Sequence, residues 1–144
     1  SETGDSTVSG MFTKREVRLA ILSLIQPTAN EIGWDVGCGF GSVTIEWARW
    51  QPFAKIHAVE NNSDRFDILS KNLEKFGLID QVQTYHGTAP MVLQKLPTPD
   101  VVYIGGSQGG IEKLMDYCWR RLNDGGRMVV SAVTEGTKAN VIQH

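Results

Sequence analysis

Three glycines and an acid form the part of the chain best suited to hold a ligand. Gly37, Gly39 and Gly41 alternate with other residues, and Asp35 stands two residues before the first glycine. Glycine lacks a Cβ, so a ligand can lie against the backbone and the turn can adopt positive φ. A helix beginning at Ser42 would direct backbone N–H groups toward that ligand. The pattern predicts a binding loop between a buried strand and a helix.

The acid before the glycines separates this loop from the dinucleotide-binding fingerprint. A carboxylate at Asp35 would repel a pyrophosphate but attract a cation. The amino and sulfonium groups of S-adenosylmethionine are cationic, so the loop favours a methyl donor. The G-x-G-x-G spacing also differs from the G-x-G-x-x-G of dinucleotide sites. NAD binding is therefore the least favoured alternative.

A second acid stands where nucleotide-binding α/β folds place a carboxylate on the ribose. The apolar strand predicted over Ile56 to Glu60 ends in that acid, at the expected distance of about 20 residues after the loop. The residues after it, Asn61 to Ser63, are typical of a turn and a helix cap. An ordinary turn with a solvated glutamate is the alternative, but the combined pattern favours a cofactor site.

Short apolar runs alternate with helical patterns along the chain. The predicted strands are Ile32 to Val36, Ile56 to Glu60, Val82 to Tyr85, Asp100 to Ile104 and Arg127 to Val133. Helices are predicted to begin near Ser42, Ser63, Ala89 and Gly109, and an earlier one at a capping box over Thr13 to Glu16. This alternation is typical of an α/β fold, with a mostly parallel sheet and helices on both faces. Ligands bind such sheets at the carboxyl ends of the strands.

Composition limits the classes of partner. The formal net charge is −2, and the Lys and Arg residues form no basic stripe, so no nucleic acid is expected. No apolar run has the length of a membrane span, and no His/Cys cluster has metal-ligand spacing, so we expect neither a membrane nor a metal. The two cysteines, Cys38 and Cys118, do not form a disulfide framework, which favours the cytoplasm. A homo-oligomer is also expected.

Several motifs in order give the chain a more specific resemblance. They are Thr13-Lys14-Arg15-Glu16-Val17-Arg18, the glycine loop, Phe76-Gly77-Leu78, Gly87-Thr88-Ala89-Pro90, the run from Pro99 to Ser107, Gly125-Gly126-Arg127 and Ala132-Val133-Thr134. With these motifs the chain resembles the methyltransferase and decarboxylase domain of cobalamin biosynthesis, either the stand-alone CbiT type or the C-terminal domain of the fused CobL type. This family has a Rossmann-like class I methyltransferase fold. The resemblance implies an S-adenosylmethionine pocket. Its expected residues are Thr13, Asp35, Gly37, Cys38, Gly39, Phe40, Gly41, Glu60 and Ala89.

The resemblance also implies a reaction and a substrate. The family methylates the precorrin bridge carbon between rings C and D and removes carbon dioxide from the ring C acetate. Gly105, Gly106 and Ser107 could present N–H groups to carboxylates of this tetrapyrrole. Lys14, Arg15 and Arg18 are weaker candidates, and catalytic residues stay unassigned, although His86 lies at a strand end. A methyltransferase acting on another small molecule or RNA, and a cofactor-binding subunit without turnover, are the alternatives.

The expected domain organisation is simple. Residues 1–10 are predicted to be a flexible leader, and residues 11–144 a methyltransferase domain that is short at its C-terminal end. Class I methyltransferases usually finish with a helix and a two-stranded hairpin after the fifth strand. We expect that hairpin to be missing from this sequence, which would leave an exposed edge on the strand ending near Val133. The alternatives are that the sequence is a fragment that lacks its tail, or that a partner subunit covers the edge.

Overall fold

A computed structural model describes residues 6–106, 109–132 and 138–144, with side chains over 15–106, 109–131 and 141–144. Helices and strands alternate along the chain, as the sequence predicts. The helices are α1 (Ser6–Ile25), α2 (Ser42–Trp50), α3 (Ser63–Lys75), the 3-10 helix η1 (Met91–Lys95) and α4 (Ile111–Arg121). The strands are β1 (Ile32–Val36), β2 (Lys55–Glu60), β3 (Val82–His86), β4 (Val101–Ile104), β5 (Arg127–Ala132) and β6 (Lys138–Gln143).

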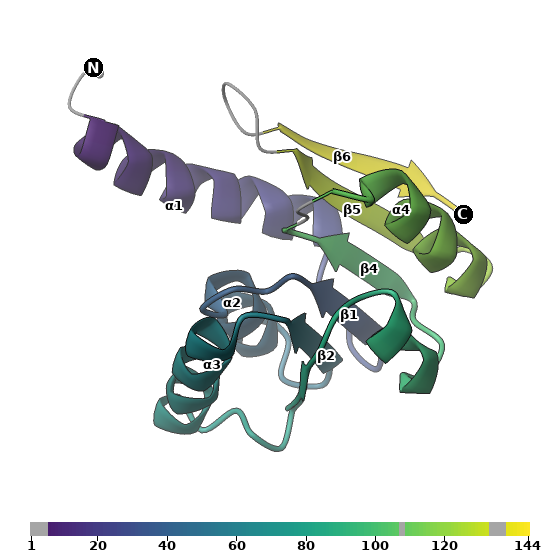
Figure 1. Ribbon diagram of the computed structural model, residues 1–144, viewed down its shortest axis with the longest axis horizontal. Coiled ribbons are helices and arrows are strands. Elements are labelled where there is room, and N and C mark those ends of the chain that lie inside the picture. The colour runs from purple at the N-terminus through teal and green to yellow at the C-terminus, as the bar shows by residue number, and fades with distance from the viewer. Residues whose placement is uncertain (1–5, 107–108, 133–137) are drawn as a thin grey trace.

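The strands form one sheet in the order β3-β2-β1-β4-β5-β6. Strands β1 to β5 are parallel, and β6 runs antiparallel to β5 (Figure 1). The order reverses between β1 and β4, and a crevice for ligands is expected at such a switch point. The predicted α/β class is confirmed, and the glycine loop follows the strand that ends at this crevice.

Two apolar cores, one on each face of the sheet, hold the layers together. Helices α1, α2 and α3 contribute to the first core, in which Leu22, Trp47 and Leu69 are almost completely buried. The 3-10 helix η1 and α4 contribute to the second, with Leu93 and Cys118 fully buried. Helices therefore cover both faces, as a mostly parallel sheet requires, because its strands are apolar on both sides.

The first helix begins earlier than the capping box predicts. Helix α1 starts at Ser6, so residues 6–10, which the sequence assigns to a flexible leader, are helical, and Thr13 is not the cap. Adding a residue to an existing helix costs less than nucleating one, so a segment without apolar periodicity can extend a packed helix.

The expectation of an exposed edge on β5 is wrong. Strand β6 pairs with all of β5, from Arg127 opposite Gln143 to Ala132 opposite Lys138. Consecutive residues of β6 reach different cores, with Val141 packed against the first and Ile142 against the second. The alternation fits a strand, but one apolar pair within a short polar segment is too weak a signal to predict it. Residues 133–137, including the predicted strand end at Val133, lie outside the described residues.

A buried arginine joins the end of α1 to β5. The Arg127 side chain donates from Nε to the carbonyl oxygen of Ile25 at 2.7 Å and from an Nη to that of Gln26 at 2.9 Å. It also forms a salt bridge with Glu31, at 2.7 Å. The contact fixes α1 across the sheet by bonds to carbonyls that the helix end leaves free.

No helix over the described residues is long and apolar enough to cross a membrane.

Candidate cofactor-binding site

A pocket lies at the carboxyl ends of β1, β2 and β4, where the sheet order reverses. Its volume is about 330 Å³, near the lower limit for small-molecule sites. The lining residues among those described are Val36, Gly37, Gly39, Val59, Glu60, Asn61, Arg65, Gly87, Thr88, Ala89, Gly106, Gly109 and Leu114. The loops after four neighbouring strands therefore meet around one ligand-sized space.

The glycine loop is held close to the neighbouring backbone. Gly37 has φ +73°, and a Cβ placed there would lie 2.5 Å from the carbonyl oxygen of Gly106. The Gly37 and Cys38 amides both donate to the carbonyl oxygen of Val59, at 2.9 and 3.0 Å. Gly39 also has positive φ, but its Cβ position is open. Gly37 is therefore required for packing of the two loops, whereas Gly39 leaves space on the ligand side.

Glu60 connects the glycine loop to the turn that starts α3. Its Oε1 accepts a hydrogen bond from the Gly39 amide at 2.7 Å, and its Oε2 accepts one from the Asn62 amide at 2.9 Å. The side chain is 3% exposed, yet it lines the pocket. A carboxylate has additional lone pairs beyond these two bonds, so it can still accept from a ligand hydroxyl. Glu60 thus has a structural role that the sequence does not reveal.

Asp35 lies behind the glycine loop, with no exposed surface. Its Oδ2 accepts a hydrogen bond from the Thr44 hydroxyl at 2.5 Å, and its Oδ1 has no partner among the described residues. Burial raises the pKa of Asp35 to about 7, the Thr44 bond opposes this shift, and the charge of Glu60 adds to it. The result is a carboxyl group that titrates near neutrality beside the pocket.

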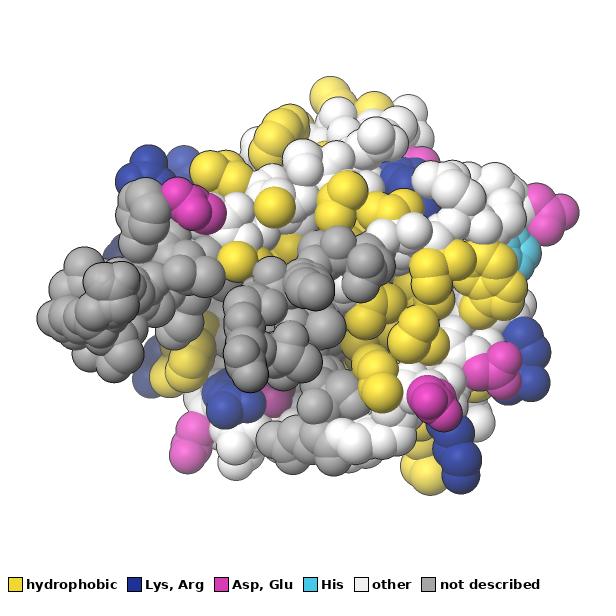
Figure 2. Space-filling model, turned by 90° about the horizontal axis from the view of Figure 1, so that it is seen from above, with side chains coloured by type: hydrophobic (Ala, Val, Ile, Leu, Met, Phe, Trp, Pro, Cys, Tyr) yellow, Lys and Arg dark blue, Asp and Glu magenta, His cyan; other side chains and the backbone are white. Residues whose placement is uncertain are grey.

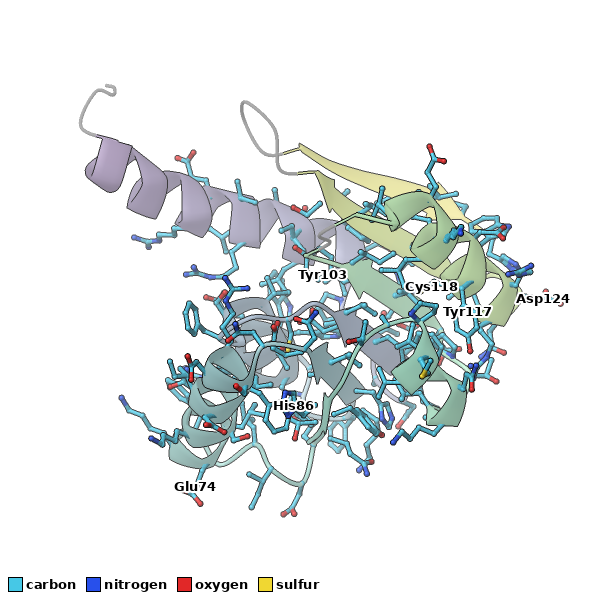
Figure 3. All side chains as sticks on the ribbon, viewed as in Figure 1. Glu74, His86, Tyr103, Tyr117, Cys118 and Asp124 are labelled. Carbon is cyan, nitrogen blue, oxygen red and sulfur yellow. The ribbon has the colours of Figure 1, made fainter. Side chains whose placement is uncertain are left out.

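The charge of Asp35 acts on two other ionisable groups, Cys38 and Tyr103. Burial, with the charges of Asp35 and Glu60 adding, raises the pKa of the Cys38 thiol far above its usual range. Burial and Asp35 likewise raise the pKa of Tyr103, while a hydrogen bond with Ser131 opposes the rise. Tyr103 packs in the first core at the end of β4 (Figure 3). Both groups stay protonated and uncharged near neutral pH, so neither balances the charges of Asp35 and Glu60.

The structure brings some predicted site residues together and separates others. Gly37, Gly39, Glu60, Ala89 and Gly106 line the pocket. The remaining predicted residues with described side chains, which are Asp35, Cys38, Phe40, Gly41 and Gly105, are not among the lining residues. The Thr13 side chain and Ser107 lie outside the described residues. The glycine loop therefore approaches the ligand space through alternate residues, because successive residues of the turn face different sides.

Other candidates from the sequence have partners elsewhere. Arg18, a candidate for substrate binding, forms a salt bridge with Glu46 of α2 at 2.8 Å. The His86 ring stacks on Phe66 with centroids 5.0 Å apart, and its Nε2 lies 3.2 Å from the carbonyl oxygen of Asn61 (Figure 3). Among the described side chains, no group of three or more His, Cys, Asp or Glu could hold a metal ion.

Sequence reasoning missed several residues of the site. Asn61, Arg65 and Thr88 line the pocket, and Thr44 holds Asp35. Thr44 could have been found, because a hydroxyl in the first turn after the loop is well placed to bond to the strand before it. Arg65 gives no such signal, since a cation in a first helical turn usually points to solvent.

The sheet order and the pocket at the end of β1 define a Rossmann-like class I methyltransferase domain. The precorrin methyltransferase domain family matches residues 7–144, and the chain belongs to this family.

Three relatives illustrate the similarity. The chain is 36% identical over 135 residues to a precorrin-6Y C(5,15)-methyltransferase [decarboxylating] of Sinorhizobium sp, covering 94% of this chain and 32% of that protein. It is 34% identical over 131 residues to a probable cobalt-precorrin-6B C(15)-methyltransferase (decarboxylating) of Methanothermobacter thermautotrophicus, covering 91% and 67%. The crystal structure of a precorrin-6y C5,15-methyltransferase of Geobacter metallireducens GS-15 superposes with TM-score 0.79 at 38% identity, covering 83% and 63%. The chain thus spans about a third of the first relative.

Proposed function

We propose that this chain binds S-adenosylmethionine and methylates the precorrin bridge carbon between rings C and D, with decarboxylation of the ring C acetate, in cobalamin biosynthesis. The observation that carries the proposal is the pocket formed by Gly37, Gly39 and Glu60 at the end of β1 and β2, in a chain of the precorrin methyltransferase family. The names of the relatives support the choice of substrate and the pairing of the two reactions.

The pocket residues fit the cofactor in shape and charge. Gly39 lines the pocket and its Cβ position is open, so a ligand can lie close to the backbone of the glycine loop there. The Oδ1 of Asp35, which has no partner in the described part of the chain, and the carboxylate of Glu60 favour a ligand with positive charge. When bound, S-adenosylmethionine supplies an electrophilic methyl group. We propose that Glu60 holds its ribose hydroxyls, in keeping with the position of this acid at the end of β2.

The chain contributes mainly position to the reaction. Methyl transfer to an electron-rich tetrapyrrole carbon depends on alignment of the two reactants more than on a strong base. Loss of carbon dioxide leaves an electron pair that the conjugated macrocycle can accept. Gly106, beside Gly37 at the edge of the pocket, is proposed to face the substrate.

A product assay tests the proposal. The chain is incubated with S-adenosylmethionine carrying an isotopically labelled methyl group and with the precorrin substrate, and the product is analysed by mass spectrometry. The expected product gains one labelled methyl group and loses one carbon dioxide. Cofactor binding by calorimetry without any product would instead support a binding subunit without turnover. Product from another substrate only would contradict the corrinoid assignment.

Location and assembly are also proposed. The thiols of Cys38 and Cys118 are both free, which supports the cytoplasm. On the face seen in Figure 2, Lys and Arg are dispersed, which supports a small-molecule substrate over nucleic acid. We also propose a homo-oligomer, in which an interface between copies would cover exposed apolar side chains such as Phe53 and Ile79, which are 71% and 63% exposed. Sedimentation analysis would test this assembly. We also propose that residues 11–144 form one methyltransferase domain.

A further inference from the structure

The pocket contains one residue whose charge the cofactor does not explain. Arg65 is the cation among the described lining residues, which also include Glu60. Its side chain is exposed and forms no salt bridge with any described acid. An exposed guanidinium at the edge of a pocket is available to an anionic ligand, with which it can form two parallel hydrogen bonds.

The backbone of Arg65 is fixed relative to the pocket. Its amide donates to the Asn62 side chain at 2.9 Å, which caps α3, and the Asn62 amide donates to Glu60 at 2.9 Å. Two successive hydrogen bonds, through Asn62, therefore join the Arg65 backbone amide to Glu60 in the pocket wall. The exposed guanidinium therefore extends from a backbone position that is tied to a lining residue of the pocket.

The size of the pocket places the substrate outside it. A volume of about 330 Å³ is near the lower limit for a site that holds one small molecule, so it leaves no room for a cofactor and a tetrapyrrole together. The macrocycle must then lie across the mouth, with its carboxylate arms directed at the surrounding loops. Glu60 and Asp35 would repel those arms. Arg65 supplies the opposite charge at the same opening.

We propose that Arg65 binds a carboxylate of the tetrapyrrole at the mouth of the cofactor pocket and thereby helps to select a polyanionic substrate. The inference rests on the proposed function for the identity of the substrate. It assigns Arg65 to the substrate rather than to the cofactor, because the cofactor is cationic and its proposed partner among the described lining residues is Glu60, whereas an exposed guanidinium favours an anion.

The test compares Arg65→Ala and Arg65→Lys with Arg49→Ala as the matched control. Arg49 is an exposed arginine on α2 that lies over the Phe76 ring, 5.0 Å from its centroid, and it does not line the pocket. Binding of S-adenosylhomocysteine is measured by calorimetry. Binding of uroporphyrin, a fluorescent tetrapyrrole octacarboxylate, is then titrated with S-adenosylhomocysteine present, at low and high salt. The KM and kcat for the precorrin are also measured.

We expect Arg65→Ala to weaken uroporphyrin binding and raise the precorrin KM by on the order of tenfold, as loss of a charge-assisted hydrogen bond does. The salt dependence of uroporphyrin binding should decrease, and Arg65→Lys should restore part of the affinity. S-adenosylhomocysteine affinity should match that of Arg49→Ala.

Other outcomes separate the two proposals. A parallel loss of S-adenosylhomocysteine affinity in Arg65→Ala would assign Arg65 to the cofactor and overturn the inference. Uroporphyrin binding that is absent, or unaffected by the substitution, would also overturn it. If uroporphyrin binding depends on Arg65 but the unmodified chain does not convert the precorrin, the proposed reaction fails and recognition of a polycarboxylate by Arg65 stands.

Discussion

Thr44 donates its hydroxyl to the buried Oδ2 of Asp35 across 2.5 Å, and this bond joins the first turn of α2 to β1. Both side chains have no exposed surface. The glycine loop lies between the two residues in sequence, so the bond closes the loop at its base. It also gives the Asp35 carboxylate a hydrogen-bond donor where water is excluded.

Removing this bond should destabilise the fold in a pH-dependent way. Thr44→Val keeps the shape of the side chain but removes the donor, so we expect a loss of about 1–3 kcal/mol in the free energy of unfolding. The pKa of Asp35 should rise further, because the Thr44 bond now lowers it. Urea unfolding should therefore show a larger loss well above pH 7 than well below it. Thr28→Val removes an exposed hydroxyl bond to Gln26 and serves as the control.

Asp35 should affect stability and cofactor binding with opposite signs. Its pKa is about 7 in the folded chain against an ordinary value of 3.8, so the folded state loses stability as pH rises through this interval. A cationic ligand prefers the ionised carboxyl, so cofactor affinity should increase as pH rises toward the folded-state pKa of about 7 and level off above it. Asp35→Asn should raise the melting temperature above pH 7 and remove both pH dependences.

Thermal unfolding and calorimetry across this pH range measure the two effects. Asp80→Asn, at an exposed position, is the control and should leave both profiles unchanged. A cofactor affinity that stays flat with pH in the unmodified chain would show that the Asp35 charge does not reach the ligand.

Glu60 should contribute to both the loop and the ligand. Glu60→Ala removes the acceptor for the Gly39 and Asn62 amides, so we expect a lower melting temperature as well as a cofactor affinity reduced by about 1–3 kcal/mol. Glu60→Gln keeps one acceptor oxygen, so its cofactor affinity in calorimetry should lie between those of the unmodified chain and Glu60→Ala. Glu74→Ala, on the exposed side of α3, is the control. An unchanged affinity in a folded Glu60→Ala variant would remove this residue from the site.

A comparison of Gly39 with Gly77, which have similar backbone conformations, can distinguish the effect of backbone strain from the loss of ligand contact. Gly39 and Gly77 have φ +59° and +68°, and neither has an atom within 4 Å of its Cβ position. Alanine at either position should cost about 1–2 kcal/mol of stability, because the left-handed region is strained for residues with a Cβ. Only Gly39 lines the pocket, so only Gly39→Ala should also weaken S-adenosylhomocysteine binding. Equal affinities of the two variants would make the glycine loop a structural turn only.

The sequence predicts the elements of this fold better than the contacts between them. Strand β1 spans Ile32–Val36 as expected, and α2 begins at Ser42. Apolar periodicity and glycine spacing are local signals, so they locate such elements directly. Strand β6 has a weak local signal, and its position depends on pairing with β5.

The candidate site follows the same division. The glycine pattern and the acid after β2 predict where the pocket lies, but not that Glu60 bonds to Gly39 across 21 residues of sequence. Nor do they predict that Asp35 lies behind the loop rather than in the pocket. Such contacts depend on the packing of neighbouring strands, which no local pattern encodes.

The contacts of Arg127 constrain the order in which a nascent chain can complete this fold. Its bonds join residues 102 and 96 positions apart, at Ile25 and Glu31. During synthesis, α1 leaves the ribosome long before the arginine that anchors it has been made. Its apolar side chains, such as Leu22 and Ile25, must meanwhile stay without their final cover. A helix made before every strand of the sheet is thus among the last elements to be secured, and the growing chain exposes an apolar surface of the kind that chaperones bind.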